Sequence, residues 1–157
     1  MAPKTARQIA QVLIDCFVYG GKVLICGNGG SAAEAQHLAA ELVCGLDKEK
    51  GSGFPAIALT TDSSILTAWS NDVGYSTVFS RQVEVLGNMG DVLICLSTSG
   101  KSLSCILASR SAIKKGLRVV DFPRTGKNTA QIQENQLKLI HKVCRLVESG
   151  MKKYEDS

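Results

Sequence analysis

The sequence predicts an α/β protein: a three-layer sandwich with a mostly parallel central sheet flanked by helices. Short apolar runs at residues 22–26, 55–59, 91–96 and 117–122 have the length and composition of buried strands. Helical spacing of apolar residues separates these runs, and strands that alternate with helices are typical of parallel sheets. The chain has 157 residues, 45% of them hydrophobic. We therefore expect a single domain over residues 1–157 with one core.

Two helices are expected around the first strand. Apolar spacing predicts a helix over residues 9–19 that ends at a pair of glycines. After the first strand, Ser31 and Glu34 have the S-x-x-E spacing of a capping box. This spacing predicts a second helix from Ala32 onward, which fades by Gly45.

The remaining elements follow in the same alternation. The expected helices are at residues 64–69, 75–86, 102–115 and 129–149, with a polar loop at 47–53. Residues 123–128 form a bare polar loop that leads from the fourth strand directly into the last helix. A fifth strand would be expected at that point.

Residues 27–31, here called the glycine turn, join the first strand to the second helix. Glycines permit a sharp turn and bring backbone N–H groups close to a ligand, and the start of the helix attracts negative charge. Residues 97–102, here called the serine turn, follow the third strand with the sequence S-T-S-G-K-S. Ligands of such sheets bind beyond the carboxyl ends of the strands, so we expect the two turns to form one site for a phosphate monoester.

Other interpretations of the glycine turn are weaker. It matches the relaxed dinucleotide fingerprint G-x-G-x-x-A, but Asp47 lies in a loop before the second strand instead of at its end. A Walker phosphate loop is excluded because the sequence has no G-x-x-x-x-G-K-[ST]. Taken alone, the glycines could also form only a tight turn that binds no ligand, and the sequence leaves this interpretation open.

Composition argues against several classes of protein. The net charge is only +4, and no basic run is interleaved with aromatic residues, so we expect no nucleic-acid partner. No apolar run approaches the ~20 residues that span a bilayer, and the first residues lack a signal peptide, so neither a membrane location nor secretion is expected. Six cysteines without C-x-x-C pairing indicate a reducing compartment, the cytoplasm.

Taken together, the motifs resemble the phosphoheptose isomerase branch of the sugar isomerase (SIS) domain family. The resemblance covers residues 20–148 and keeps the order of the family's motifs. These are C-G-N-G-G-S at residues 26–31, H-x-x-x-E at 37–41, N-D at 71–72, S-T-S-G at 97–100, and I-Q-E at 132–134 with His141. His37 and Glu41 lie one helical turn apart, which alone is typical of a surface ion pair. However, the chain has only two histidines, and both fall on positions where the family has functional groups.

The resemblance implies an SIS-type fold and a cytoplasmic homotetramer with active sites at subunit interfaces. It implies interconversion of sedoheptulose 7-phosphate and D-glycero-D-manno-heptose 7-phosphate, for lipopolysaccharide heptose, with one zinc ion per subunit. The implied metal positions are His37, Glu41, Gln133 and His141. The implied substrate contacts are Asn28, Gly29, Gly30, Glu41, Asn71, Asp72, Ser97, Thr98, Ser99, Ser102 and Gln133.

Isomerisation through an enediol needs a base and an acid, and we assign these roles to Glu41 and His141. Zinc near them would act as a Lewis acid. Coordination would lower the basicity of Glu41, and the sequence leaves open which role dominates. Gln133 and His141 are separated by about 12 Å of helix rise, so they either lean toward one metal or serve different composite sites.

The chain departs from the family pattern at several places. Gly45 stands where the family usually has an arginine, and Lys101 replaces an asparagine, where its ammonium group could supply charge to the phosphate. Part of the N-terminal helix and about 20 residues after Phe122 are missing relative to the family, including the fifth strand. Loss of a core strand would expose apolar surface and unpaired backbone groups. Either a mobile loop is omitted or the protein is truncated, and we expect the first, seen as a break between Phe122 and Arg124.

Two non-enzymatic alternatives remain. One is an adaptor with the SIS fold, like the replication-initiator-associating protein, which binds protein partners as a tetramer. The other is a regulator that senses a phosphosugar through the serine turn. Retention of His37, Glu41, Gln133 and His141 favours the enzyme.

Overall fold

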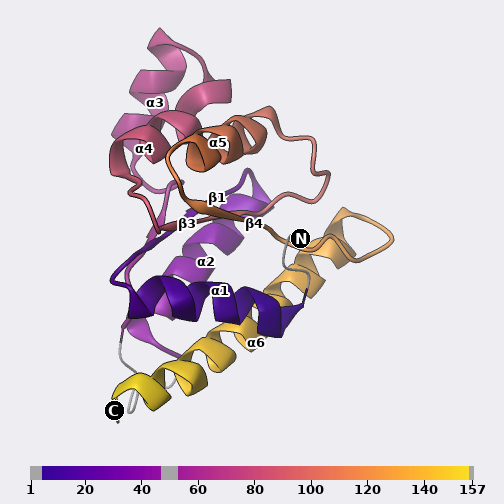
Figure 1. The fold of residues 1–157 in the computed structure, drawn as a ribbon. Helices are drawn as coiled ribbons and strands as arrows, with labels where there is room; N and C mark the ends of the chain where they lie inside the picture. The colour runs from indigo at the N-terminus through magenta and orange to yellow at the C-terminus, as the bar shows by residue number, and fades with distance from the viewer. Residues whose placement is uncertain (1–4, 47–52, 156–157) are drawn as a thin grey trace.

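A computed structural model describes residues 5–46 and 53–155 of the chain (Figure 1). Strands and helices alternate as predicted, and most boundaries agree within a few residues. The elements are α1 (Ala6–Val18), β1 (Val23–Cys26), α2 (Gly30–Cys44), β2 (Ala56–Ala58), α3 (Ser63–Asp72), the 3₁₀ turn η1 (Tyr75–Thr77), α4 (Val78–Leu86), β3 (Val92–Cys95), α5 (Leu103–Lys114), β4 (Arg118–Asp121) and α6 (Thr129–Glu155). Most of the loop expected at residues 47–53 lies outside the described residues.

The sheet is parallel throughout, with the strand order β2-β1-β3-β4. The two central strands, β1 and β3, share the sequence V-L-I-C and are buried along their whole length. Burial on both faces explains why these strands are continuous apolar runs without polar alternation. The predicted mostly parallel sheet is confirmed.

Helices cover both faces of the sheet, which makes three layers (Figure 1). One core cluster packs α1, α2 and α6 against side chains such as Ile25 and Ile94. A second cluster packs α4 and α5 against Leu24 and Leu93 on the opposite face. Successive strand residues point to opposite faces, so each central strand contributes to both clusters.

The C-terminal helix α6 is the longest element and packs against α1 and α2. It begins at Thr129 as predicted and continues to Glu155, six residues beyond the predicted end. Across the described part of the chain, no helix combines the length and apolar composition needed to cross a membrane.

The chain continues without a break from β4 through residues 122–128 into α6, so the expected break between Phe122 and Arg124 is wrong. Within the described residues β4 pairs only with β3 and forms one edge of the sheet. Arg118 and Asp121 are exposed at the two ends of β4, whereas Val120 between them is buried. Charged side chains on an edge strand discourage pairing with other chains. This composition explains how the sheet ends without the fifth strand.

Candidate active site

The glycine turn begins α2 two residues earlier than predicted. Gly29 is the N-cap residue with φ 55° and ψ −122°, a conformation that side chains disfavour, and it makes no side-chain capping bond. The capping box predicted for Ser31 and Glu34 is therefore wrong. Both residues lie inside the helix and are buried, and neither Glu34 carboxylate oxygen has a hydrogen-bond partner among the described residues. This burial raises the pKa of Glu34 from 4.5 to about 7.

Hydrogen bonds of Asn28 join the glycine turn to the serine turn. Its Nδ2 donates to Ser102 Oγ at 2.6 Å and to Ser104 Oγ at 3.0 Å. The Tyr75 hydroxyl donates to Asn28 Oδ1 at 2.5 Å. Both turns thus lie at the carboxyl ends of the neighbouring parallel strands β1 and β3 and are held together.

The serine turn is closed by its own hydroxyl groups. Ser97 Oγ accepts from the Gly100 N–H at 3.0 Å, and Ser99 Oγ accepts from the Lys101 N–H at 3.1 Å. A hydroxyl that accepts from the backbone retains its own hydrogen to donate. Thr98 between them is half-buried. The turn leads into α5, whose first N–H groups lack intrahelical acceptors and favour an anion.

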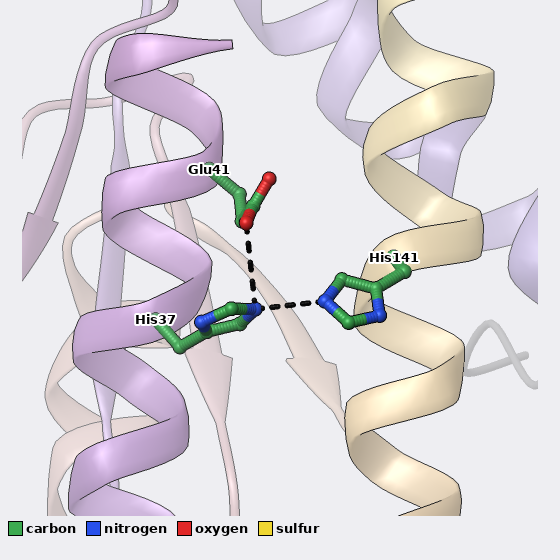
Figure 2. Close-up of side chains that lie close together, drawn as sticks. All are labelled: His37, Glu41 and His141. Atoms are coloured by element: carbon green, nitrogen blue, oxygen red, sulfur yellow. Dashed lines mark hydrogen bonds and ion pairs between the residues drawn. The ribbon is translucent and has the colours of Figure 1, made fainter. Parts of the chain in front are cut away.

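Two histidines and one glutamate converge where α2 lies beside α6 (Figure 2). His37 Nε2 is 2.9 Å from His141 Nε2 and 3.5 Å from Glu41 Oε1. One ligand atom from each of the three lies within 4.8 Å of those of the others, and all three side chains are half-buried. Residues distant in sequence, on two helices, are therefore brought together as the resemblance implied.

The donor set of this cluster fits a zinc ion. Imidazole nitrogen and carboxylate oxygen are both zinc ligands, and three protein ligands leave a position open in catalytic sites. Two Nε2 atoms that face each other at 2.9 Å need either one shared proton or a common cation between their lone pairs. The cluster therefore has the chemistry of a metal site.

Gln133 lies where the first turn of α6 meets the start of α2. Its side-chain amide fills the space that a Cβ at Gly30 would need. Further along, the Leu46 N–H donates to Glu148 Oε1 at 2.5 Å, so α6 runs beside α2 in the same direction. Gln133 thus borders the glycine turn, consistent with a substrate contact. Its assignment as a metal ligand stays a prediction.

Asn71 and Asp72 make no hydrogen bond to either turn among the described residues. They end α3, are exposed, and bond to each other through Asn71 Nδ2 and Asp72 Oδ1 at 2.8 Å. In Figure 1, α3 projects from the body of the domain on the side opposite α6. Their role as substrate contacts stays a prediction.

Sequence reasoning missed three residues at this edge of the sheet, namely Tyr75, Ser104 and Arg124. Tyr75 and Ser104 bond directly to Asn28 or to its partner Ser102. The Arg124 guanidinium packs against Gly100 of the serine turn. The position of Arg124 just after the carboxyl end of a strand was the available signal, whereas nothing in the sequence marked Tyr75.

Comparison with known proteins agrees with this geometry. The model of the SIS domain family matches residues 4–122, about three quarters of the chain. The chain belongs to the SIS domain family. The match ends at Phe122, where the fourth strand is complete.

Close relatives of this SIS domain are named as enzymes. The phosphoheptose isomerase of Roseiflexus sp. is 49% identical over 156 residues, covering 89% of this chain and 79% of the relative. That of Burkholderia pseudomallei is 49% identical over 163 residues, covering 94% and 82%. This alignment is longer than the chain itself, so the relative has residues without a counterpart here. These relatives favour the enzyme over the adaptor.

Solved structures show the same fold. The phosphoheptose isomerase of Neisseria gonorrhoeae superimposes with a TM-score of 0.84 at 39% identity, covering 92% of this chain and 85% of that one. The enzyme from Francisella tularensis gives a TM-score of 0.86 at 32% identity with the same coverage. The predicted SIS-type three-layer fold is confirmed.

Proposed function

We propose that this protein is a phosphoheptose isomerase that interconverts sedoheptulose 7-phosphate and D-glycero-D-manno-heptose 7-phosphate, a precursor of lipopolysaccharide heptose. The observation that carries the proposal is the convergence of His37, Glu41 and His141 at α2, the helix that begins at the glycine turn. A relative with this name at 49% identity supports the choice of sugar.

The reaction moves a proton between adjacent carbons. Glu41 removes a proton from the carbon next to the ketone, while His141 donates a proton to the ketone oxygen, which gives an enediol. Glu41 then returns its proton to the former carbonyl carbon, and His141 takes the hydroxyl proton as the aldehyde forms. Glu41 Oε1 faces His37, and the second carboxylate oxygen is available for this transfer.

Zinc fits the same cluster. His37, Glu41 and His141 would hold the ion, with Gln133 as the proposed fourth ligand, and bound zinc would supply Lewis-acid stabilisation of the sugar oxygens. Glu41 would hold the ion through Oε1 and His141 through Nε2, which leaves Glu41 Oε2 and His141 Nδ1 for proton transfer. His37 Nε2 is directed at both His141 and Glu41, so His37 serves to orient these two side chains with or without the ion.

The turns hold the phosphate end of the sugar. Ser97, Thr98, Ser99 and Ser102 present hydroxyls beside the start of α5, and Asn28, Gly29 and Gly30 contribute backbone and amide groups. Fixing the distant phosphate orients the reacting carbons toward Glu41 and His141, which lowers the entropy loss in the transition state.

We further propose a homotetramer in which a neighbouring subunit completes each site. In support, α3 buries none of its residues, although it carries Asn71 and Asp72 and the exposed Ile65. A monomeric species with full activity in solution would contradict this assembly. The six free cysteines support a cytoplasmic location, where thiols stay reduced.

The test is turnover of sedoheptulose 7-phosphate by the metal-loaded protein, with and without a chelator. Glu41→Gln and His141→Ala should each lower kcat by about 10² to 10⁴, the contribution of a general base or acid. Lys142→Ala alters an exposed neighbour on α6 and should retain wild-type activity. Absence of turnover by the metal-loaded wild type would reject the isomerase.

A further inference from the structure

Arg124 places a guanidinium group against the serine turn. A Cβ at Gly100 would lie 2.8 Å from Arg124 Cζ and 3.1 Å from its Nε, so the group rests on the glycine backbone. Gly100 has φ 66°, and both its conformation and this contact require the absence of a side chain. The cation therefore lies at the proposed phosphate site.

The backbone around Arg124 is held in place by α6. The Pro123 carbonyl accepts from Gln136 Nε2 at 3.1 Å, and the Thr125 carbonyl accepts from Asn135 Nδ2 at 2.9 Å. Gln136 is almost fully buried. Both neighbours of Arg124 are thus fixed, so the direct passage from β4 into α6 sets the direction of its side chain.

Asp121 orients the guanidinium from the end of β4. Arg124 Nη2 lies 2.7 Å from Asp121 Oδ2, and Nη1 donates to Oδ1 at 2.8 Å, a bidentate pair. This pair uses two of the five guanidinium N–H donors, and no further bond from the others is found in the described residues. About a third of the Arg124 side chain is exposed. The remaining donors are accessible to a ligand at the serine turn.

We propose that Arg124 contacts the phosphate of the substrate at the serine turn, a role that rests on the proposed function. The hydroxyls of the turn and the first N–H groups of α5 supply neutral donors, and Arg124 supplies the positive charge. A planar fork that is already oriented loses little side-chain entropy when it binds phosphate oxygens. Arg124 is thus a substrate-binding residue that takes no part in proton transfer.

The test is binding of inorganic phosphate to the metal-loaded protein, measured by calorimetric titration at low ionic strength. Arg124→Gln should weaken binding by about tenfold, as expected for loss of a charged hydrogen bond. Asp121→Asn keeps the Oδ1 acceptor that orients Arg124 Nη1 and removes the neighbouring negative charge, so it should bind phosphate at least as tightly as the wild type. Arg118→Gln removes a comparable exposed arginine, paired to Asp15 at 3.2 Å, and should bind normally.

Wild-type affinity in Arg124→Gln, or equal losses in Arg124→Gln and Asp121→Asn, would overturn the proposal. Circular dichroism of both variants checks that each remains folded. With sedoheptulose 7-phosphate, Arg124→Gln should raise KM with little change in kcat, the signature of lost ground-state binding. If the wild type shows no turnover, the proposed function fails, and the phosphate titration still decides the role of Arg124.

Discussion

Replacement of Glu34 by glutamine should stabilise the protein at alkaline pH. Glu34 is 8% exposed, and neither of its carboxylate oxygens has a partner in the described structure. Burial raises its pKa from 4.5 to about 7, so the folded state retains a proton that the unfolded state has lost. The free energy of unfolding should therefore fall as pH rises from 4.5 to 7. The full loss above pH 7 is about 3 kcal/mol at about 1.4 kcal/mol per pKa unit.

The assay is urea denaturation of the wild type and Glu34→Gln at pH 5 and pH 8.5. Glutamine is neutral throughout, so the variant should differ little from the wild type at pH 5 and be more stable by up to about 3 kcal/mol at pH 8.5. Glu134→Gln, at an exposed position of α6, is the control and should show no such pH-dependent gain. An equal difference at both pH values would refute a buried, ionisable Glu34.

Two further substitutions probe the glycine turn and the amino-terminal ends of the central strands. Tyr75→Phe removes the donor to Asn28 Oδ1 and should lower kcat/KM by about fivefold, the effect of one hydrogen bond, with an unchanged melting temperature; a wild-type kcat/KM would show that this bond does not position Asn28. Asp91 is 2% exposed and accepts from the Lys22 N–H, Lys22 Nζ and the Asn88 N–H. Asp91→Ala should lower the free energy of unfolding by about 3–5 kcal/mol in urea denaturation, because it leaves two backbone N–H groups and the Lys22 ammonium without their acceptor; a change below about 1 kcal/mol would contradict this role of the buried carboxylate.

The architecture was accessible from the sequence because apolar burial determines it. The V-L-I-C runs of β1 and β3 can be buried on both faces only inside a parallel sheet, and their carboxyl ends bring the two turns together. The motif at Ser31 and Glu34 misled because the conformation of Gly29 begins the helix without a side-chain cap. Ser31 and Glu34 have the spacing of a capping box, but the helix begins at Gly29 without any side-chain cap.

Site residues were predictable from the sequence only where a motif puts them on the same helix or in the same turn. His37 and Glu41 share a helix face, whereas their approach to His141 depends on how α6 packs against α2, which no local pattern contains. Tyr75 reaches Asn28 from a 3₁₀ turn whose position is set by tertiary packing. Arg124 depends on the unusual direct passage from β4 into α6.

Conversion of sedoheptulose 7-phosphate by the purified, zinc-loaded protein in D₂O, followed by proton NMR, tests the central claim most directly. A base that exchanges its proton with solvent should deliver deuterium to the second carbon of the aldose, and Glu41→Gln should form labelled product at least about 10²-fold more slowly. Formation of deuterated heptose 7-phosphate by the wild type is the predicted result. An unchanged ketose after prolonged incubation would contradict it.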